Sequence, residues 1–214
     1  MGGADVEILR HIGVDEKWVP FSSFEDLMLH VNGAKDEVAA EPGKRFFYLN
    51  EGYVLLGLIV ERVSQLRYEY YVRDRILRPL KMNRSTFLRE EFEKDADGMT
   101  PYFMEKKDGA IIATPTVHPI SRMSYAPGGL MSSVIELTNF LIANMNHGVF
   151  GDVKLLDATL LGEMHKPHAV ANFSSLFGKI FYGYGWHMED NFFGHMLRSQ
   201  RFHRSFECEH FFCA

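Results

Sequence analysis

A phenol and a carboxamide stand two residues apart where an aromatic run meets an apolar helical pattern. The run Phe46-Phe47-Tyr48 is followed by Leu49 and Asn50. A phenol can transfer a proton and a carboxamide can hydrogen-bond a carbonyl group, so this tripeptide is a candidate catalytic turn. The structural alternative is equally simple, because tyrosines pack in aromatic strands and Asn is a frequent helix N-cap. The tripeptide alone leaves both interpretations open.

The sequence around the tripeptide contains many ordered matches to one enzyme family. From Pro42 it reads PG-x4-Y-x-N-x-GY-xx-LG-xxx-E-x-VS, from Tyr68 it reads Y-xx-YV-xxx-IL-x-PL-x-M, and APGGLMSS precedes a later helix. This pattern, which extends to about Leu197, resembles the serine β-lactamase and penicillin-binding-protein-like hydrolases. The resemblance is strongest to their class C-like, esterase and D-aminopeptidase branch.

The resemblance implies a role for Tyr48 and a role for Asn50. In that family the Tyr of Y-x-N replaces the Ser of S-D-N, one of three motifs at an acyl-transfer site. It implies that Tyr48 is the catalytic proton shuttle and that Asn50 binds the substrate's amide or ester carbonyl side. A free phenol has a pKa of about 10, so Tyr48 needs neighbouring cations or a proton relay to act as a base. The family supplies these through the Lys of S-x-x-K and the basic residue of K/H-[ST]-G.

Neither partner motif is present in this sequence. No Ser or Thr has a Lys three residues later, and the nearest approach is Ser64 with Arg67. No Lys or His precedes Ser/Thr-Gly, and G-x-S-x-G is absent as well. We therefore expect a serine hydrolase that acts through an acyl-enzyme but is truncated and inactive as this chain. The alternative is a non-catalytic pseudoenzyme or a partner-binding remnant of the same family.

The last residues of the chain depart from the family pattern. From Arg198 the sequence RSQRFHRSFECEHFFCA is basic and aromatic, lacks strand alternation, and contains both cysteines, Cys208 and Cys213. Reading the codons from Ser199 one base later permits a run of small residues typical of the missing third motif. We expect a partial β-lactamase-like domain over residues 1–197 and a frameshifted tail over 198–214.

Composition excludes several other classes. The formal net charge is -5 with 24% charged residues, so no basic surface for nucleic acid is expected. No apolar run approaches the roughly 20 residues of a membrane helix, and no signal peptide is evident, so a cytoplasmic location is the default. The spacing of Cys208, His210 and Cys213 fits no common zinc site, and His165 and His168 are expected to be solvated at a helix end. No metal and no cofactor is expected, and the partner is a small-molecule or peptide acyl substrate.

The periodicities predict an α+β protein, a partial β-lactamase/transpeptidase-like fold. Helices are expected over 22–33, 51–65, 68–76 and 155–164, with another between a Ser133/Glu136 capping box and Gly148. Gly57 should mark a close helix contact, because Gly inside a helix costs about 1 kcal/mol relative to Ala. A remnant antiparallel sheet should pair Phe181–Met188 with Phe192–Leu197 through a turn at Glu189-Asp190. Its exposed edges should favour self-association.

Overall fold

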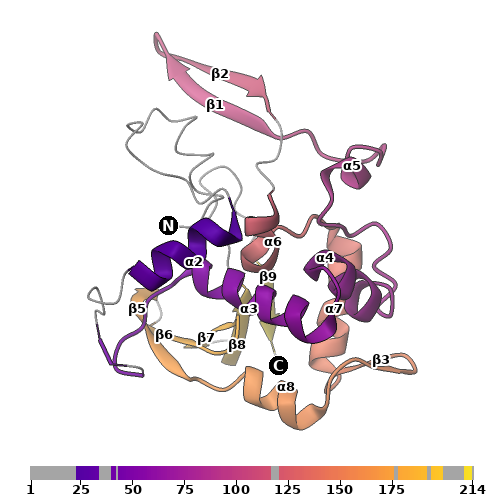
Figure 1. Cartoon of the computed structure of the whole chain (residues 1–214), viewed down its shortest axis with the longest axis vertical. Coiled ribbons are helices and arrows are strands. Elements are labelled where there is room, and N and C mark those ends of the chain that lie inside the picture. The colour runs from indigo at the N-terminus through magenta and orange to yellow at the C-terminus, as the bar shows by residue number, and fades with distance from the viewer. Residues whose placement is uncertain are drawn as a thin grey trace. The chain divides into compact units, whose positions relative to one another are not determined.

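The computed structural model describes residues 23–33, 40–41, 43–116, 121–175, 178–191, 194–199 and 210–213. The chain divides into two compact units, which are described separately (Figure 1). Unit 1 comprises Met1–Glu37 and Leu49–Glu136, and unit 2 comprises Val38–Tyr48 and Leu137–Ala214. The boundary therefore falls between Tyr48 and Leu49.

Unit 1 is mainly helical, and the helices expected around the Y-x-N segment are present. Its elements are α2 (Phe24–Gly33), α3 (Asn50–Ser64), α4 (Tyr68–Val72), the π-helical turn η2 (Arg73–Leu77), α5 (Arg89–Phe92), the hairpin β1 (Tyr102–Lys107) and β2 (Ala110–Pro115), and α6 (Arg122–Gly128). Helix α7 (Val134–Met145) begins in unit 1 and continues in unit 2.

The core of unit 1 forms where α2, α3 and α6 meet. Leu27, Val54 and Met123 are buried together, and partly buried Phe24 and Leu55 pack against them. The closest approach is at Gly57 of α3, where an added Cβ would lie 2.8 Å from the Cβ of Ala126 in α6. The expectation that Gly57 marks a close helix contact is confirmed.

The buried face of α3 differs from the predicted one. Periodicity predicts a buried stripe that includes Leu56 and Val63, yet these side chains are 53% and 79% exposed. The buried positions are instead Glu51, Val54 and Gly57. A helix that is apolar on most sides has no unique face by pattern alone, and the close contact at Gly57 selects the face that meets α6.

The capping box predicted at α7 is half formed. The backbone N–H of Glu136 donates to Ser133 Oγ at 3.2 Å, as predicted. The Glu136 carboxylate, however, accepts from the backbone N–H of Arg84 at 2.9 Å and from Ser85 Oγ at 2.6 Å. Ser85 Oγ also lies 2.6 Å from Ser132 Oγ. A buried carboxylate is stable only when it is hydrogen-bonded, so this network fixes the loop before Phe87 against the start of α7.

Unit 2 contains an antiparallel sheet of five strands. The strands are β5 (Ala169–Ser175), β6 (Gly178–Tyr182), β7 (His187–Asn191), β8 (Gly194–Ser199) and β9 (His210–Cys213), in the spatial order of the sequence. The short strands β3 (Val149–Phe150) and β4 (Val153–Lys154) and the helix α8 (Ala158–Met164) precede it. Together with unit 1 these elements make the α+β class and the partial β-lactamase/transpeptidase-like fold that the sequence predicts.

The predicted strand pair is wrong in detail. Phe181–Met188 is a hairpin, since Tyr182 of β6 pairs with His187 of β7 across a turn. Gly183 is required there because a Cβ would lie 2.4 Å from the carbonyl oxygen of Met164, and Gly185 has a φ of +81°. Glu189 and Asp190 are not a turn but pair with β8 inside β7. Phe192 lies outside the described residues.

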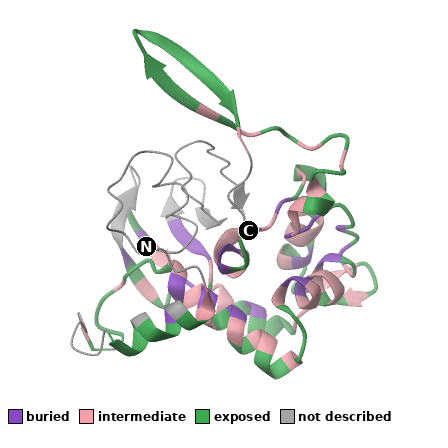
Figure 2. Ribbon diagram, turned by 45° about the horizontal axis from the view of Figure 1, so that its top comes forward, coloured by how far each residue is buried: buried purple, intermediate pink, exposed green. Residues whose placement is uncertain are grey.

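Aromatic packing closes the core of unit 2. Trp186 is buried and stacks on Phe140 of α7, with ring centroids 6.3 Å apart. His165 meets the Trp186 ring edge-on at 5.2 Å. The prediction that His165 is a solvated residue is therefore wrong, because this side chain is half-buried against the indole ring. Figure 2 shows the buried part of the sheet, which includes Met188 at 1% exposure.

The contact at Gly57 can be tested by adding one methyl group. Gly57→Ala should lower the free energy of unfolding by up to about 2 kcal/mol, because overpacking costs about 1–3 kcal/mol and the gain in helix propensity offsets about 1 kcal/mol of that cost. Gly52→Ala in the same helix is the control, since its Cβ would meet only Leu49 Cδ2 at 3.9 Å. Urea denaturation measures both. Equal effects of the two substitutions would contradict the close contact.

Asp157 gives a pH-dependent contribution to stability. Its carboxylate accepts from Lys154 Nζ at 2.8 Å and caps α8 through the N–H of Thr159 at 2.9 Å. The Lys154 bond first, and then the cap, lower the pKa of Asp157 to about 2. Because the folded pKa lies below the unfolded value of about 3.9, this stabilisation is complete above pH 4 and is lost as pH falls toward 2. Asp157→Asn should therefore flatten the fall in melting temperature between pH 5 and 2, whereas Asp152→Asn in the β3–β4 turn should not.

Candidate active site

Tyr48 lies against the sheet of unit 2. Its side chain is 47% exposed, and its ring centroid lies 6.2 Å from that of Tyr182, edge-on, and 6.4 Å from that of His187. Phe46, two residues earlier, packs on Tyr182 at 5.0 Å. Phe46 and Tyr48, two residues apart in this extended segment, thus both contact Tyr182. Tyr48 is a half-exposed phenol held by ring contacts.

His187 is a residue that the sequence interpretation missed. It is 4% exposed, and its ring lies 5.0 Å from that of Tyr182, the residue opposite it in the sheet. Its proximity to Tyr48 depends on the register of the β6–β7 hairpin. Reading Tyr184-Gly185 as a two-residue turn would have predicted that register, because Gly183 then faces Trp186 and the next pair along the strands is Tyr182 and His187.

Asn50 lies at the start of α3 in unit 1. It is the first residue of the helix and is half-buried, whereas the N-cap position belongs to Leu49, whose backbone is extended (φ -135°, ψ 107°). No side chain makes the N-cap hydrogen bond of this helix. The structural alternative for Asn50, a helix N-cap, is therefore wrong.

Glu61 fixes the other end of the helix that carries Asn50. Its Oε1 accepts the backbone N–H of Tyr68 at 2.8 Å, which joins α3 to the start of α4. The same carboxylate accepts from the guanidinium of Arg122 at 3.0 Å and 3.2 Å, which joins α3 to α6. The Glu of the family pattern thus holds α3 against two neighbouring helices.

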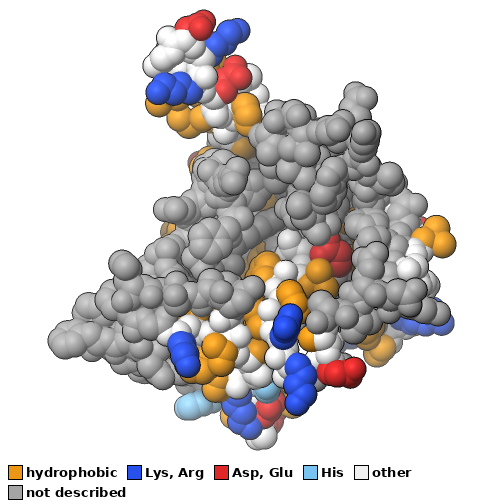
Figure 3. All heavy atoms as spheres, turned by 90° about the vertical axis from the view of Figure 1, so that its left-hand side faces the viewer, with side chains coloured by type: hydrophobic (Ala, Val, Ile, Leu, Met, Phe, Trp, Pro, Cys, Tyr) orange, Lys and Arg blue, Asp and Glu red, His pale blue; other side chains and the backbone are white. Residues whose placement is uncertain are grey.

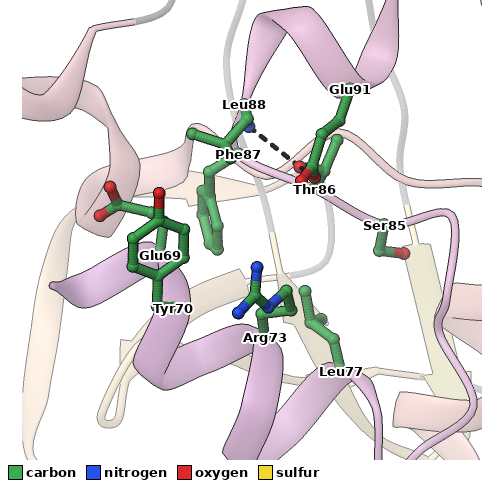
Figure 4. A pocket seen from close by; sticks show the side chains of 9 residues that line it. All are labelled: Glu69, Tyr70, Arg73, Leu77, Ser85, Thr86, Phe87, Leu88 and Glu91. Carbon is green, nitrogen blue, oxygen red and sulfur yellow. Dashed lines mark hydrogen bonds between the residues drawn. The ribbon is translucent and has the colours of Figure 1, made fainter. Parts of the chain in front are cut away.

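Two hollows in unit 1 contain neither Tyr48 nor Asn50. The first, with a cavity volume of only about 10 Å³, is lined by the nine side chains in Figure 4. Thr86 Oγ1 accepts the N–H of Leu88 at 3.0 Å and donates to Glu91, and buried Glu69 forms an ion pair with Arg67. The second, wider hollow adjoins it and is lined largely by charged side chains that include Arg84, itself paired with Asp95. Ser85 lines both hollows and donates its hydroxyl to Glu136 at 2.6 Å, so the hydroxyls of Ser85 and Thr86 are both hydrogen-bonded to carboxylates.

Two tyrosines of unit 1 ionise less readily than a free phenol. Burial raises the pKa of Tyr68, and burial together with Glu69 raises the pKa of Tyr125. A higher pKa makes it harder for a phenol to give up its proton near neutral pH. The chemistry expected of a base therefore does not transfer from Tyr48 to these two residues.

Across the described ranges, no group of three or more His, Cys, Asp or Glu side chains could hold a metal ion. His168 instead stacks on Tyr184, with centroids 4.2 Å apart, and hydrogen-bonds the carbonyl oxygen of Glu163 at 2.9 Å. Cys208 lies outside the described residues, so the tail does not enter this finding.

Comparison with known proteins identifies the family. The family model described as Beta-lactamase matches residues 25–206, and the chain belongs to this family of serine β-lactamases and penicillin-binding-protein-like hydrolases. The mouse (Mus musculus) serine beta-lactamase-like protein LACTB, mitochondrial, is 31% identical over 149 residues, 70% of this chain and 26% of that protein. The match to the family model continues past residue 197, while the division there and the frameshift stay predictions.

Solved structures show the same fold. The octameric penicillin-binding protein homologue from Pyrococcus abyssi is 35% identical, with a TM-score of 0.77 over 92% of this chain and 42% of that chain. The D-amino acid amidase from Ochrobactrum anthropi SV3 is 22% identical, with a TM-score of 0.57 over 87% of this chain and 50% of that one, and supports the fold alone. The chain spans half or less of the length of each of these proteins.

In the part of the chain that the structure describes, every helix is too short or too polar to cross a membrane. The cytoplasmic location expected from the sequence stays a prediction. The mouse relative is named as mitochondrial.

The role of Glu61 can be separated into its two contacts. Glu61→Ala should lower the free energy of unfolding by about 1–3 kcal/mol, because it leaves the Tyr68 N–H without its acceptor. Glu61→Gln keeps an acceptor oxygen and loses only the partly exposed ion pair with Arg122, which is worth about 0–1 kcal/mol. Urea unfolding of the three proteins measures this. If Gln is as damaging as Ala, the ion pair and not the backbone bond holds α3.

Proposed function

We propose that this chain supplies the Tyr-x-Asn part of the acyl-transfer site of a serine hydrolase. Tyr48 shuttles the proton and Asn50 binds the carbonyl side of an amide or ester substrate. The observation that carries the proposal is the family match over residues 25–206, with Tyr48-Leu49-Asn50 at the start of α3. The half-exposed position of Tyr48 and the absence of a capping role for Asn50 support it.

The same proposal assigns no turnover to the 214-residue chain alone. Acyl transfer needs a nucleophile, and the family nucleophile is the Ser of S-x-x-K, a motif that this sequence does not contain. The phenol also needs a cation that favours its ionised form, and K/H-[ST]-G is absent too. Tyr48 is then a base without a hydroxyl to deprotonate. The substrate class extends no further than a small-molecule or peptide acyl compound.

A second candidate function is binding without catalysis. The absence of two of the three motifs favours it, since a pseudoenzyme keeps the packing residues of its family and loses the reactive ones. We further propose that the chain self-associates. The Pyrococcus abyssi homologue, at 35% identity, is octameric, and the sheet of unit 2 ends in the edge strands β5 and β9.

Hydrolysis of nitrocefin and of short-chain p-nitrophenyl esters tests the catalytic proposal. The 214-residue chain should give no burst and no turnover. A chimera that adds segments carrying the family motifs S-x-x-K and K/H-[ST]-G should turn over, and Tyr48→Phe in that chimera should lower kcat about 10²–10⁴-fold, the usual contribution of general acid–base catalysis.

Two controls make this test specific. Tyr184→Phe removes a more exposed phenol of the same unit and should leave kcat unchanged, since Tyr184 stacks on His168 and lies outside the proposed site. Burst acylation by the 214-residue chain would overturn the proposed inactivity. An active chimera that is insensitive to Tyr48→Phe would overturn the role of Tyr48 and leave the family assignment intact.

A further inference from the structure

The β1–β2 hairpin has one charged strand and one uncharged strand. β1 reads Tyr-Phe-Met-Glu-Lys-Lys, whereas β2, Ala110–Pro115, reads Ala-Ile-Ile-Ala-Thr-Pro. Edge strands of natural sheets commonly carry charges, especially Lys, that prevent pairing with another chain. Glu105, Lys106 and Lys107 give β1 this protection, and β2 has none.

The hairpin is exposed and stands away from the helices of its own unit (Figures 1 and 2). Every residue of β2 is exposed, Ile111 by 69%, and on β1 Met104 is exposed by 62%. The space-filling view shows charged and hydrophobic side chains together on its surface (Figure 3). Among the described strands, only β1 pairs with β2. A two-stranded ribbon alone is marginally stable, so a further strand paired with the uncharged outer edge of β2 would stabilise the hairpin.

We propose that β2 pairs antiparallel with β2 of a second copy of this chain, which gives a four-stranded sheet β1-β2-β2-β1. This inference deepens the proposed self-association and rests on it. Two identical strands pair antiparallel about a two-fold axis perpendicular to the sheet, and residues opposite each other point to the same face. The axis therefore passes midway between the two copies of one residue. In the apolar part of β2 this residue is Ile111 or Ile112.

Charge favours a second copy as the occupant. Centred on Ile111, the pairing places Ala110 opposite Ile112. Centred on Ile112, it places Ile111 opposite Ala113, so no charged pair forms in either register. In the corresponding registers of β1, centring on Glu105 would place Glu opposite Glu and centring on Lys106 would place Lys opposite Lys, which is destabilising. In these registers β2 forms no like-charge pair, whereas β1 forms one.

The pairing also joins the apolar side chains of one face of each hairpin. In the β1–β2 register Met104 lies opposite Ala113 and Lys106 lies opposite Ile111. Alternation therefore puts these four residues on one face together with Tyr102 and Pro115, and Lys106 is the one charged residue of that face. In the four-stranded sheet Ile111 and Ala113 of both copies become neighbours at the centre, with Met104 of each copy beside them.

A charge-matched pair of double variants tests the proposal in the 214-residue chain. Ile111→Glu with Ala113→Glu places Glu opposite Glu in either register, and should raise the dissociation constant of the oligomer about tenfold or more. Within the hairpin the introduced carboxylate at position 111 faces Lys106, so the β1–β2 pairing gains an opposite-charge pair and no repulsion. Tyr102→Glu with Met104→Glu adds the same charge to the same face, but on β1, and should change the dissociation constant less than about threefold by the same reasoning. Sedimentation equilibrium over a range of concentrations measures all three proteins, and circular dichroism verifies their folding.

Hydrogen exchange locates the contact directly. Amides of residues 110–114 should become more protected as wild-type concentration rises, and should not do so in the Ile111/Ala113 variant, because pairing satisfies the outward N–H groups of β2. A wild-type chain that stays monomeric would overturn both the proposed self-association and this pairing. An oligomer that survives the Ile111/Ala113 variant, or that responds equally to both variants, would overturn the pairing alone.

Discussion

The helical unit depends on the approach of α3 to α6 at Gly57. With no side chain at this position, the two helices come close enough that a Cβ would lie 2.8 Å from that of Ala126. Glu61, one helical turn later, adds hydrogen bonds to Tyr68 and Arg122 on the neighbouring helices. Gly57 and Glu61 both belong to the family pattern, and their role is structural. They fix the position and the rotation of α3, whose first residue is Asn50. The orientation of that carboxamide is therefore set by packing about two turns away.

The sheet unit positions Tyr48 by a comparable constraint. Gly183 and Gly185 permit the tight turn that joins β6 to β7, and this turn makes Tyr182 and His187 cross-strand neighbours. Tyr48 lies against these two rings. The Tyr48 ring contacts both of these rings, and the residue is 47% exposed. These contacts define its position while part of the side chain stays open to solvent.

Sequence patterns predicted the elements better than their contacts. Helix α3, the close packing at Gly57 and the α+β class follow from apolar periodicity and from the cost of Gly in a helix. The buried face of α3 did not, because apolar residues on every side leave the rotation to a single contact. The β6–β7 hairpin was missed because alternation continues through Gly183-Tyr184-Gly185, where conformational freedom and not hydrophobicity determines the turn. His187 was missed with it, since a buried imidazole is found only once the register is known.

Family membership and catalysis rest on different residues of this chain. The family pattern includes residues that pack, such as Gly57 and Glu61, and these keep their roles whatever chemistry the site performs. Catalysis in such a site needs a nucleophile, a cation and a proton shuttle acting together, and removing one partner of a cooperating set removes nearly the whole effect. In the proposed function Tyr48 is the shuttle, and the sequence contains neither S-x-x-K nor K/H-[ST]-G. Strong likeness to the family is therefore compatible with no turnover at all. The chemical requirement on the shuttle is electrostatic, because a phenol with a pKa of about 10 becomes a base near neutral pH only through neighbouring cations.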